Sequence, residues 1–180
     1  MDRPVELIPL VCIKCSTPVP AGPDEVAWVC AQCGQGMALD DEKGLASLEV
    51  QYSSAGPPGA QGKPFWVVEG EAALQQRQTY SGNQDRSAQA FWSQPRRFFI
   101  PAFTSPLETL LNLGTNFLLQ PPDLQPGPPV RFDPVTLYAE DVPAAAEFIL
   151  MAVEAGRKDK LKELNFSLKL SSPCLWILPS

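Results

Sequence analysis

Four cysteines near the start of the chain are the residues with the clearest chemistry. They form two Cys-x-x-Cys pairs, Cys12 with Cys15 and Cys30 with Cys33, and fourteen residues separate the pairs. A tetrahedral Zn²⁺ takes four soft ligands, and two short knuckles that face each other across a hairpin supply them. The spacing therefore predicts a zinc site with these four cysteines as its ligands.

Two other chemistries use similar residues. Iron is the alternative metal, because a rubredoxin-type site has the same four ligands. A thiol-redox pair is less favoured, since a redox Cys-x-x-Cys usually stands alone at the start of a helix. Four thiolates complete a tetrahedron, so we expect a structural rather than a catalytic site. The pattern leaves open whether the metal only folds a small segment or also shapes a recognition surface.

The rest of the sequence lacks the usual catalytic residue sets. The chain has no histidine, which removes the commonest general acid or base and the commonest ligand of a catalytic metal. Neither a GxGxxG motif nor a Walker-type phosphate loop is present. Acidic residues such as Asp40, Asp41, Glu42, Glu69 and Glu71 have no accompanying nucleophile. We therefore expect that the protein is not an enzyme.

An aromatic stretch, residues 91–103, contains the two arginines Arg96 and Arg97. In one interpretation it is a platform for single-stranded nucleic acid, with bases stacked on the rings and the arginines on phosphates. In the other it is a core strand preceded by two surface arginines. The second interpretation is favoured, because the chain is acidic and few basic residues lie nearby.

The composition is that of a folded, loop-rich and acidic protein. Hydrophobic residues make up 44% of the 180, which is enough for a core, and the 20 prolines and 12 glycines indicate many turns. The net charge of −6 disfavours broad binding to nucleic acid. No stretch reaches the ~18 apolar residues that span a membrane, and the start of the chain lacks the pattern of a signal peptide. We therefore expect a cytoplasmic protein without membrane contact, in a compartment where paired cysteines hold metal.

The elements that position the cysteines are short. A strand at residues 25–29 leads into Cys30, and Gly34 after the second knuckle permits a positive φ that turns backbone amides toward a thiolate. Ser16 occupies the same position in the first knuckle and is less suited to it. Two such knuckles on hairpins describe a zinc ribbon. We assign the ribbon to residues 1–42 and expect a second domain at residues 43–180, with a core of its own.

The first part of the second domain shows strand patterns. Alternating apolar residues predict a strand over residues 45–52. A flexible loop is expected at 53–63, short strands at 65–68 and 97–100, and a continuing meander at 72–81.

Two helices are expected next. The first begins at Ser105, which is predicted to be its N-cap with Glu108 completing a capping box, and it places Gly114 on its packed face. The second runs from about residue 143 to 155 with Asp141 as its cap. Its predicted buried stripe consists of Ala145, Phe148, Ile149 and Ala152.

Two strands close the chain. Residues 164–170 alternate between apolar and polar, whereas residues 174–178 are apolar on both faces and are expected to be central. Trp176 is expected to be buried against the preceding strand, and Cys174 to be a core thiol. The order of elements predicts an α+β fold: a small zinc ribbon followed by a mainly antiparallel β domain with two helices.

Four segments together resemble a family of uncharacterised bacterial zinc-ribbon proteins. They are the paired-cysteine ribbon, Arg-Phe-Phe-Ile-Pro-Ala-Phe at 97–103, Glu-Phe-Ile-Leu at 147–150 and Lys-Glu-Leu-Asn-Phe-Ser-Leu-Lys-Leu at 162–170. In this family a ribbon precedes a β-rich domain. The resemblance covers most of the chain, and its specific part is the ribbon. It implies a metal site at the four cysteines and nothing catalytic.

These observations lead to a function of the interaction class. We expect a non-enzymatic zinc-ribbon protein that acts as a protein–protein interaction or adaptor module, with another protein as its partner. The alternative is an accessory factor that binds nucleic acid through the ribbon and the strand that carries Arg96 and Arg97.

Overall fold

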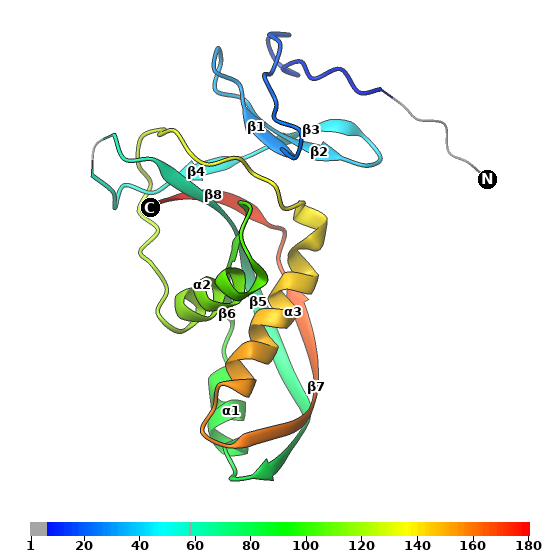
Figure 1. Cartoon of the computed structure of the whole chain (residues 1–180), viewed down its shortest axis with the longest axis vertical. Helices are drawn as coiled ribbons and strands as arrows, with labels where there is room; N and C mark the ends of the chain where they lie inside the picture. The colour runs from blue at the N-terminus through cyan, green and yellow to red at the C-terminus, as the bar shows by residue number, and fades with distance from the viewer. Residues whose placement is uncertain (1–6, 58) are drawn as a thin grey trace, which may run out of the picture.

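Two β-sheets and the helices packed on the larger sheet form an elongated molecule (Figure 1). The structure is a computed structural model that describes residues 7–57 and 59–180. The architecture is α+β, as the sequence predicts, with a small sheet near the cysteines and a larger, mainly antiparallel one. Residues 1–6 of the predicted ribbon domain lie outside the described residues.

The small sheet carries the cysteine-bearing segment. Its three strands within the described residues are antiparallel, in the order β1 (Ala27–Val29), β2 (Gly36–Asp40) and β3 (Gly44–Leu48). The pairing of β2 with β3 is close at Gly36, where a Cβ atom would lie 2.2 Å from the carbonyl oxygen of Leu48. A glycine is therefore required at this point of the sheet.

The strand predicted over residues 45–52 is divided at Glu49 between the two sheets. Its first part is β3 of the small sheet, and its second part is β4 (Val50–Tyr52), which pairs in parallel with β8 (Cys174–Pro179) of the larger sheet. The predicted division at residues 42 and 43 stays a prediction. The pairing nevertheless places β3, which begins at Gly44, in the cysteine-bearing sheet.

A single long strand, β5 (Gly62–Ser81), organises the larger sheet. One edge of β5 pairs with β6 (Arg96–Pro101); the other pairs first with β8 and then with β7 (Lys160–Leu170). The order β4-β8-β5-β6, with β7 beside β5, accounts for five strands within the described residues. The segments predicted separately at 65–68 and 72–81 are thus one strand, which extends as a two-stranded arm with β7 (Figure 1).

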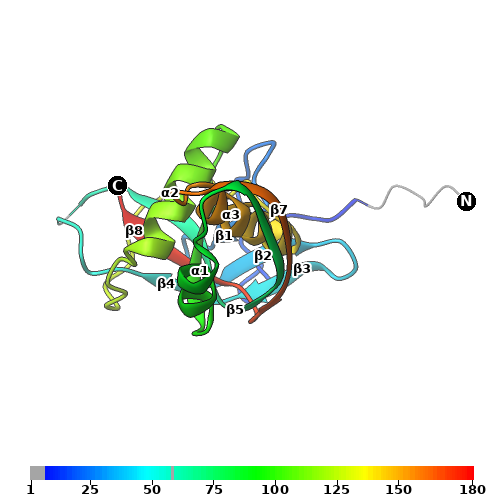
Figure 2. The same ribbon diagram turned by 90° about the horizontal axis from the view of Figure 1, so that it is seen from below.

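The three described helices lie against the larger sheet. Helices α2 (Leu107–Leu119) and α3 (Val142–Ala155) match the two predicted helices, and a short 3₁₀ turn at Ala139–Asp141 precedes α3. These two helices contact each other (Figure 2). Both contact β6, and α3 also contacts β7. Helix α1 (Asp85–Trp92), which the sequence analysis missed, packs on β5 near the end of the arm. None of the helices in residues 7–57 and 59–180 has the length and apolar character needed to cross a lipid bilayer.

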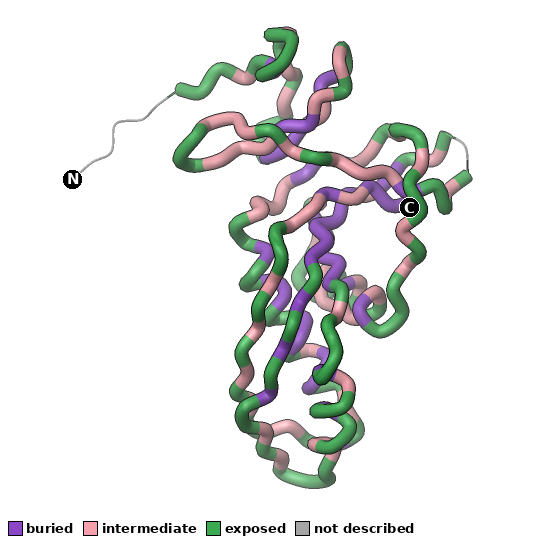
Figure 3. The backbone as a smooth tube through the Cα atoms, turned by 180° about the vertical axis from the view of Figure 1, so that it is seen from behind, coloured by how far each residue is buried: buried purple, intermediate pink, exposed green. Residues whose placement is uncertain are grey.

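The main core lies between these helices and the sheet, and the buried residues concentrate there rather than along the arm (Figure 3). Trp66, Phe98 and Ile149 are among its fully buried side chains. Gly114 of α2 is on the packed face, as predicted, because a Cβ atom there would lie 2.4 Å from Cδ1 of Ile149.

Two predictions about large side chains are wrong. Trp176 is only half-buried, because alternation along β8 turns Leu175 and Ile177 into the main core and Trp176 onto the opposite face. There it packs in a second, smaller apolar cluster around Phe65. Phe148, expected in the buried stripe of α3, is 50% exposed.

One of the two predicted caps is at the wrong residue, and the other is at the right residue but makes no side-chain capping hydrogen bond. The N-cap position of α2 is occupied by Pro106 rather than Ser105, and the Ser105 hydroxyl is buried without a hydrogen-bond partner among the described residues. Asp141 occupies the N-cap position of α3, but the preceding 3₁₀ turn gives it helical backbone angles, φ −84° and ψ −9°. An N-cap side chain normally acts from an extended conformation, so the early helical turn removes that role.

Candidate metal centre

The first knuckle is shaped by two backbone hydrogen bonds around Cys12. The Cys12 amide donates to the Thr17 carbonyl at 2.8 Å, and the Ser16 amide donates to the Cys12 carbonyl at 2.9 Å. In addition, the Lys14 amide lies 3.4 Å from the Cys12 sulfur. Backbone amides directed at a sulfur favour its thiolate form, which is the form that binds a metal.

The second knuckle repeats this pattern. The Cys30 amide donates to the Gln35 carbonyl at 2.9 Å, and the Gly34 amide donates to the Cys30 carbonyl at 2.8 Å. Gly34 has φ +74°, as expected for the residue after the second cysteine, and Ser16 has φ +59° at the equivalent position of the first knuckle. Ser16 therefore adopts the left-handed conformation that glycine takes more easily, so the two knuckles share one geometry.

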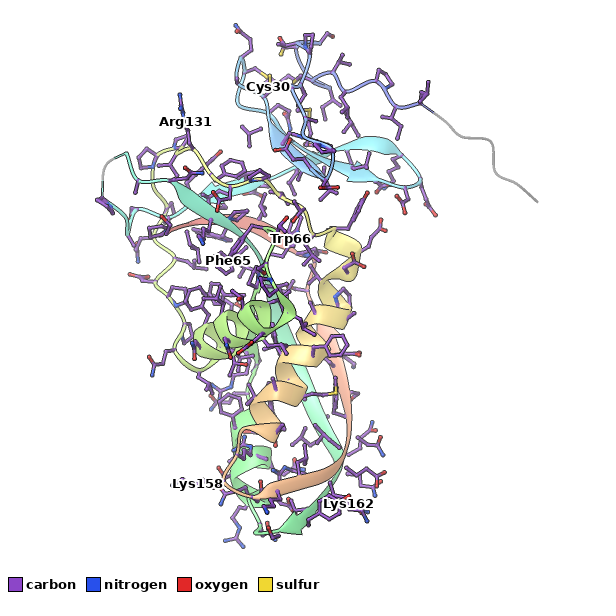
Figure 4. All side chains as sticks on the ribbon, in the orientation of Figure 1. Cys30, Phe65, Trp66, Arg131, Lys158 and Lys162 are labelled. Carbon is purple, nitrogen blue, oxygen red and sulfur yellow. The ribbon has the colours of Figure 1, made fainter. Side chains whose placement is uncertain are left out.

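The knuckles bring the four sulfurs together. All four Sγ atoms lie within 4.8 Å of one another, and the Cys12–Cys33 and Cys15–Cys30 pairs are both 3.6 Å apart. A disulfide would need about 2.05 Å, whereas Zn–S bonds of ~2.3 Å in a tetrahedron imply sulfur separations of ~3.8 Å. The predicted ligands thus form one cluster with the spacing of a metal site (Figure 4, around Cys30).

The thiols of this cluster are electrostatically unequal. Hydrogen bonding to the side chain and backbone of Thr17 lowers the pKa of Cys15 to about 6. The pKa of Cys33 is raised to about 12 although a backbone hydrogen bond from Gln35 opposes the shift, because burial and the neighbouring sulfurs disfavour a second negative charge. A divalent cation at the centre would supply the positive charge that lets all four thiolates coexist.

Two of the four cysteines belong to a small apolar cluster. Cys12 and Cys30 are buried together with Trp28 and Met37, whereas Cys15 is exposed at the surface. The Trp28 indole donates a hydrogen bond of 3.0 Å to Glu25. This cluster is too small to act as a full core, so a bound metal ion would add much to the stability of the segment.

The cysteine-bearing sheet is joined to the rest of the structure through β1 and the residue before it. The Val26 amide donates to the Val135 carbonyl at 2.8 Å, and Ala27 forms a β-bridge with the same residue. Val26 and Ala27 belong to the main hydrophobic core. The start of β1 and the residue before it are therefore part of the main core.

The arginines considered for nucleic-acid binding are engaged within the chain. The Arg96 guanidinium lies 3.8 Å from the centre of the Phe91 ring and donates two hydrogen bonds to the Phe91 carbonyl. Arg97 pairs with Glu69 at 2.6 Å on the surface, while Phe98 and Phe99 are fully buried. These contacts match the favoured interpretation of a core strand preceded by surface arginines.

A second polar cluster, which the sequence analysis missed, lies along the arm. Its centre is Arg77 of β5, whose side chain is only 2% exposed. Arg77 donates to Glu154 of α3 at 2.8 Å, to Asp159 at 2.6 and 2.7 Å, and to Asp85 of α1 at 2.9 Å. Mainly through its hydrogen bonds with Arg77, the pKa of Asp159 is lowered to about 2.

Glu154 extends this cluster to other elements. Its carboxylate, which is 0% exposed, also accepts hydrogen bonds from the Trp92 indole at 2.7 Å and from Arg157 at 2.8 Å. The sequence held only a partial signal: Glu154 directly follows the apolar run at residues 148–153 of α3, whereas Arg77 lies among polar residues of β5. We call Arg77, Asp85, Glu154, Asp159 and Arg157 the ionic cluster of the arm.

Comparison with protein-family models, with curated proteins and with solved structures found no match for this chain. The resemblance to bacterial zinc-ribbon proteins accordingly stays a prediction. What the geometry establishes is a cluster of four cysteines that is able to bind a metal ion.

Proposed function

We propose that the protein is a non-enzymatic zinc-ribbon protein in which Cys12, Cys15, Cys30 and Cys33 hold a structural zinc ion. The observation that carries the proposal is the closed set of four sulfurs, all within 4.8 Å of one another. Four thiolate ligands fill a tetrahedral site, so the ion has no position left for substrate or water. Iron would use the same ligands and is the alternative metal.

Elemental analysis of the freshly purified chain tests the metal assignment. One equivalent of zinc per chain is expected, and the Cys30→Ser variant should lose it, because three thiolates hold zinc much more weakly at neutral pH. Iron in place of zinc, or four freely titratable thiols without metal, would contradict the assignment.

We further propose that the ribbon is an adaptor that binds another protein. Four aliphatic side chains around the first knuckle support this: Leu7, Ile8, Val11 and Ile13 are 89%, 37%, 37% and 47% exposed. Exposed apolar side chains that gather on one small module are typical of interaction surfaces. The metal would hold the knuckle in the conformation that presents them.

A cavity elsewhere in the domain gives no support to an enzymatic role. The cavity of about 840 Å³ between the 53–62 loop and residues 128–131 has Arg131 as the charged residue of its described lining. Prolines and small residues make up most of the rest. The described residues of this lining include no carboxylate or thiol that could supply acid–base or nucleophilic chemistry.

The adaptor proposal is tested by capture from native lysate at near-physiological salt. The immobilised wild-type chain should retain a specific protein, and Ile13→Asp, which leaves the four ligands intact, should abolish the retention. Tyr80→Ser is the matched control, because Tyr80 is 74% exposed but lies at the end of the arm. Repeated failure of the wild-type chain to retain a partner, or equal loss with both variants, would count against an adaptor that acts through the ribbon.

A further inference from the structure

Strand β7 lies at an open edge of the larger sheet. It pairs with β5 along one side, and within residues 7–57 and 59–180 no strand pairs with its other side. Figure 1 shows β7 along the outer margin of the molecule. The strand is 11 residues long, and a free edge of that length presents a row of backbone donors and acceptors that another strand can use.

The apolar layer beneath the sheet continues to this edge. Leu164, Phe166 and Leu168 point to the side covered by α3, yet they are only partly buried. Helix α3, which packs on β7, exposes Phe148 (50%) and Met151 (37%). The apolar side chains of β7 are those expected in a buried strand. No element of the described chain covers them fully.

The opposite face of β7 is polar over residues 163–169, with a charged side chain at each end of this segment. Glu163, Asn165, Ser167 and Lys169 are exposed. The segment begins after a bulge at Lys162, where the pairing with β5 shifts between Gln78 and Thr79. Lysines on an edge strand usually oppose edge-to-edge pairing, but Lys160 and Lys162 lie outside the segment that begins at Glu163.

This segment is complementary to itself when two copies run antiparallel with Phe166 opposite Phe166. In that register Glu163 of each copy lies opposite Lys169 of the other. The pairing therefore has one opposite-charge pair at each of its two ends. The remaining opposed pairs match in character: Leu164 with Leu168 on the apolar face, and Asn165 with Ser167 on the polar face. Other registers that preserve the faces lose both charge pairs, and a shift by one residue reverses the faces.

We infer that two copies of the chain associate through β7, with the strands antiparallel and centred on Phe166, so that the two larger sheets become one. The pairing is symmetric, as is usual for a dimer, because the same surface serves both partners. It leaves the four cysteines free, since the ribbon lies at the opposite end of the molecule from the tip of the arm (Figure 4). The inference is independent of the proposed adaptor function.

The association is tested by sedimentation equilibrium and by size-exclusion chromatography with light scattering on the full, metal-loaded chain. The wild type is expected at twice the 19.6 kDa of one chain. Glu163→Lys and Lys169→Glu should each raise the dissociation constant by about tenfold, because two favourable cross-strand pairs become two like-charge pairs. The double variant, in which the charges are exchanged, should restore the wild-type value.

Controls separate this effect from a loss of folding. Lys169 is opposite Glu71 of β5 within the chain, so circular dichroism and thermal unfolding are recorded for every variant. Lys160→Glu reverses a charge on the same strand but outside the paired segment, and it should leave the dissociation constant unchanged.

A cysteine-mixing experiment tests the register itself. Asn165→Cys and Ser167→Cys chains, mixed and oxidised, should form a disulfide-linked heterodimer, because directly opposed residues of antiparallel strands lie within disulfide range. Either chain alone should crosslink much less. A wild-type chain that stays monomeric at about 100 μM, well above the range typical of specific dimers, would overturn the inference. So would a dimer that the charge exchange does not affect, or crosslinking that is equal in mixed and unmixed samples; these results would leave the adaptor proposal standing.

Discussion

Each end of the molecule contains a cluster of side chains that can carry charge. The clusters differ in chemistry: one consists of thiols, and the other of carboxylates and arginines. At one end, the four cysteine sulfurs lie within 4.8 Å of one another, in an arrangement that could hold one metal ion. At the other end, the buried side chain of Arg77 pairs with Glu154 and Asp159. The cysteine end is arranged to take up an ion from solution, whereas the other end neutralises its charges with residues of the chain.

The comparison shows how sequence separation decides what can be predicted. The four clustered cysteines come in two pairs, each with its members only three residues apart, so their spacing can be recognised in the sequence. In the ionic cluster, Arg77 and Asp159 are separated by 82 positions and meet only because β5 and the start of β7 lie side by side.

The largest expected effect is at the metal. Cys30→Ser should abolish zinc binding and unfold the ribbon, because metal-binding free energies on the order of 10 kcal/mol are also folding free energies in such modules. The larger domain should stay folded, with some loss of stability because Val26 and Ala27 complete its core. Zinc content and amide NMR spectra of the variant measure both effects. A single transition that unfolds the whole chain would mean that the two ends do not fold independently.

The next largest effect is at the ionic cluster. Arg77→Met should destabilise the larger domain by about 3–5 kcal/mol, because Glu154 and Asp159 would remain buried without their cation. Urea unfolding followed by circular dichroism gives the value. Arg97→Ala is the matched control, since its ion pair with Glu69 is exposed. Equal, small changes for both arginines would show that the ionic cluster does not stabilise the arm.

The ionic cluster should also make stability depend on pH. The pKa of Asp159 is lowered from 3.8 to about 2 by hydrogen bonds with Arg77, so its contribution is present above pH 3.8 and is lost as the pH falls toward 2. The thermal midpoint should fall over this range in the Cys30→Ser background, where metal loss plays no part. The fall should be smaller when Asp159→Asn is added. An identical pH profile with and without Asp159→Asn would rule out this carboxylate as the cause.

The smallest expected effects are at the arginines beside β6. Arg97→Ala should change the free energy of unfolding by about 0.5 kcal/mol or less, as for other exposed ion pairs. Arg96→Ala should cost slightly more, about 0.5–1 kcal/mol, because its guanidinium stacks on Phe91. Urea titration of the two variants distinguishes them. A loss of several kcal/mol from Arg97→Ala would show that its surroundings are buried rather than exposed.

The sequence by itself determined which four cysteines cluster and what the fold class is. Local spacing set the two knuckles, since a Cys-x-x-Cys turn brings its own two sulfurs together without help from distant residues. Periodicity located α2 and α3 and the strands around residues 97–100 and 164–178, because each of these segments buries one regular face or is buried on both.

Only the tertiary structure decided the rest. Helix α1 has only eight residues, and its two buried side chains, Ala88 and Trp92, are one turn apart, so a single turn of pattern becomes recognisable only through its packing on β5. The break at Glu49 follows from which sheet each half of its segment joins. Trp176 and Phe148 are as hydrophobic as core residues, but their exposure depends on which elements pack against the faces on which they lie. Within the described chain, neither face is fully covered. Arg77 and Glu154 are acceptable inside the protein only because folding brings each to the other, and no local pattern encodes that meeting.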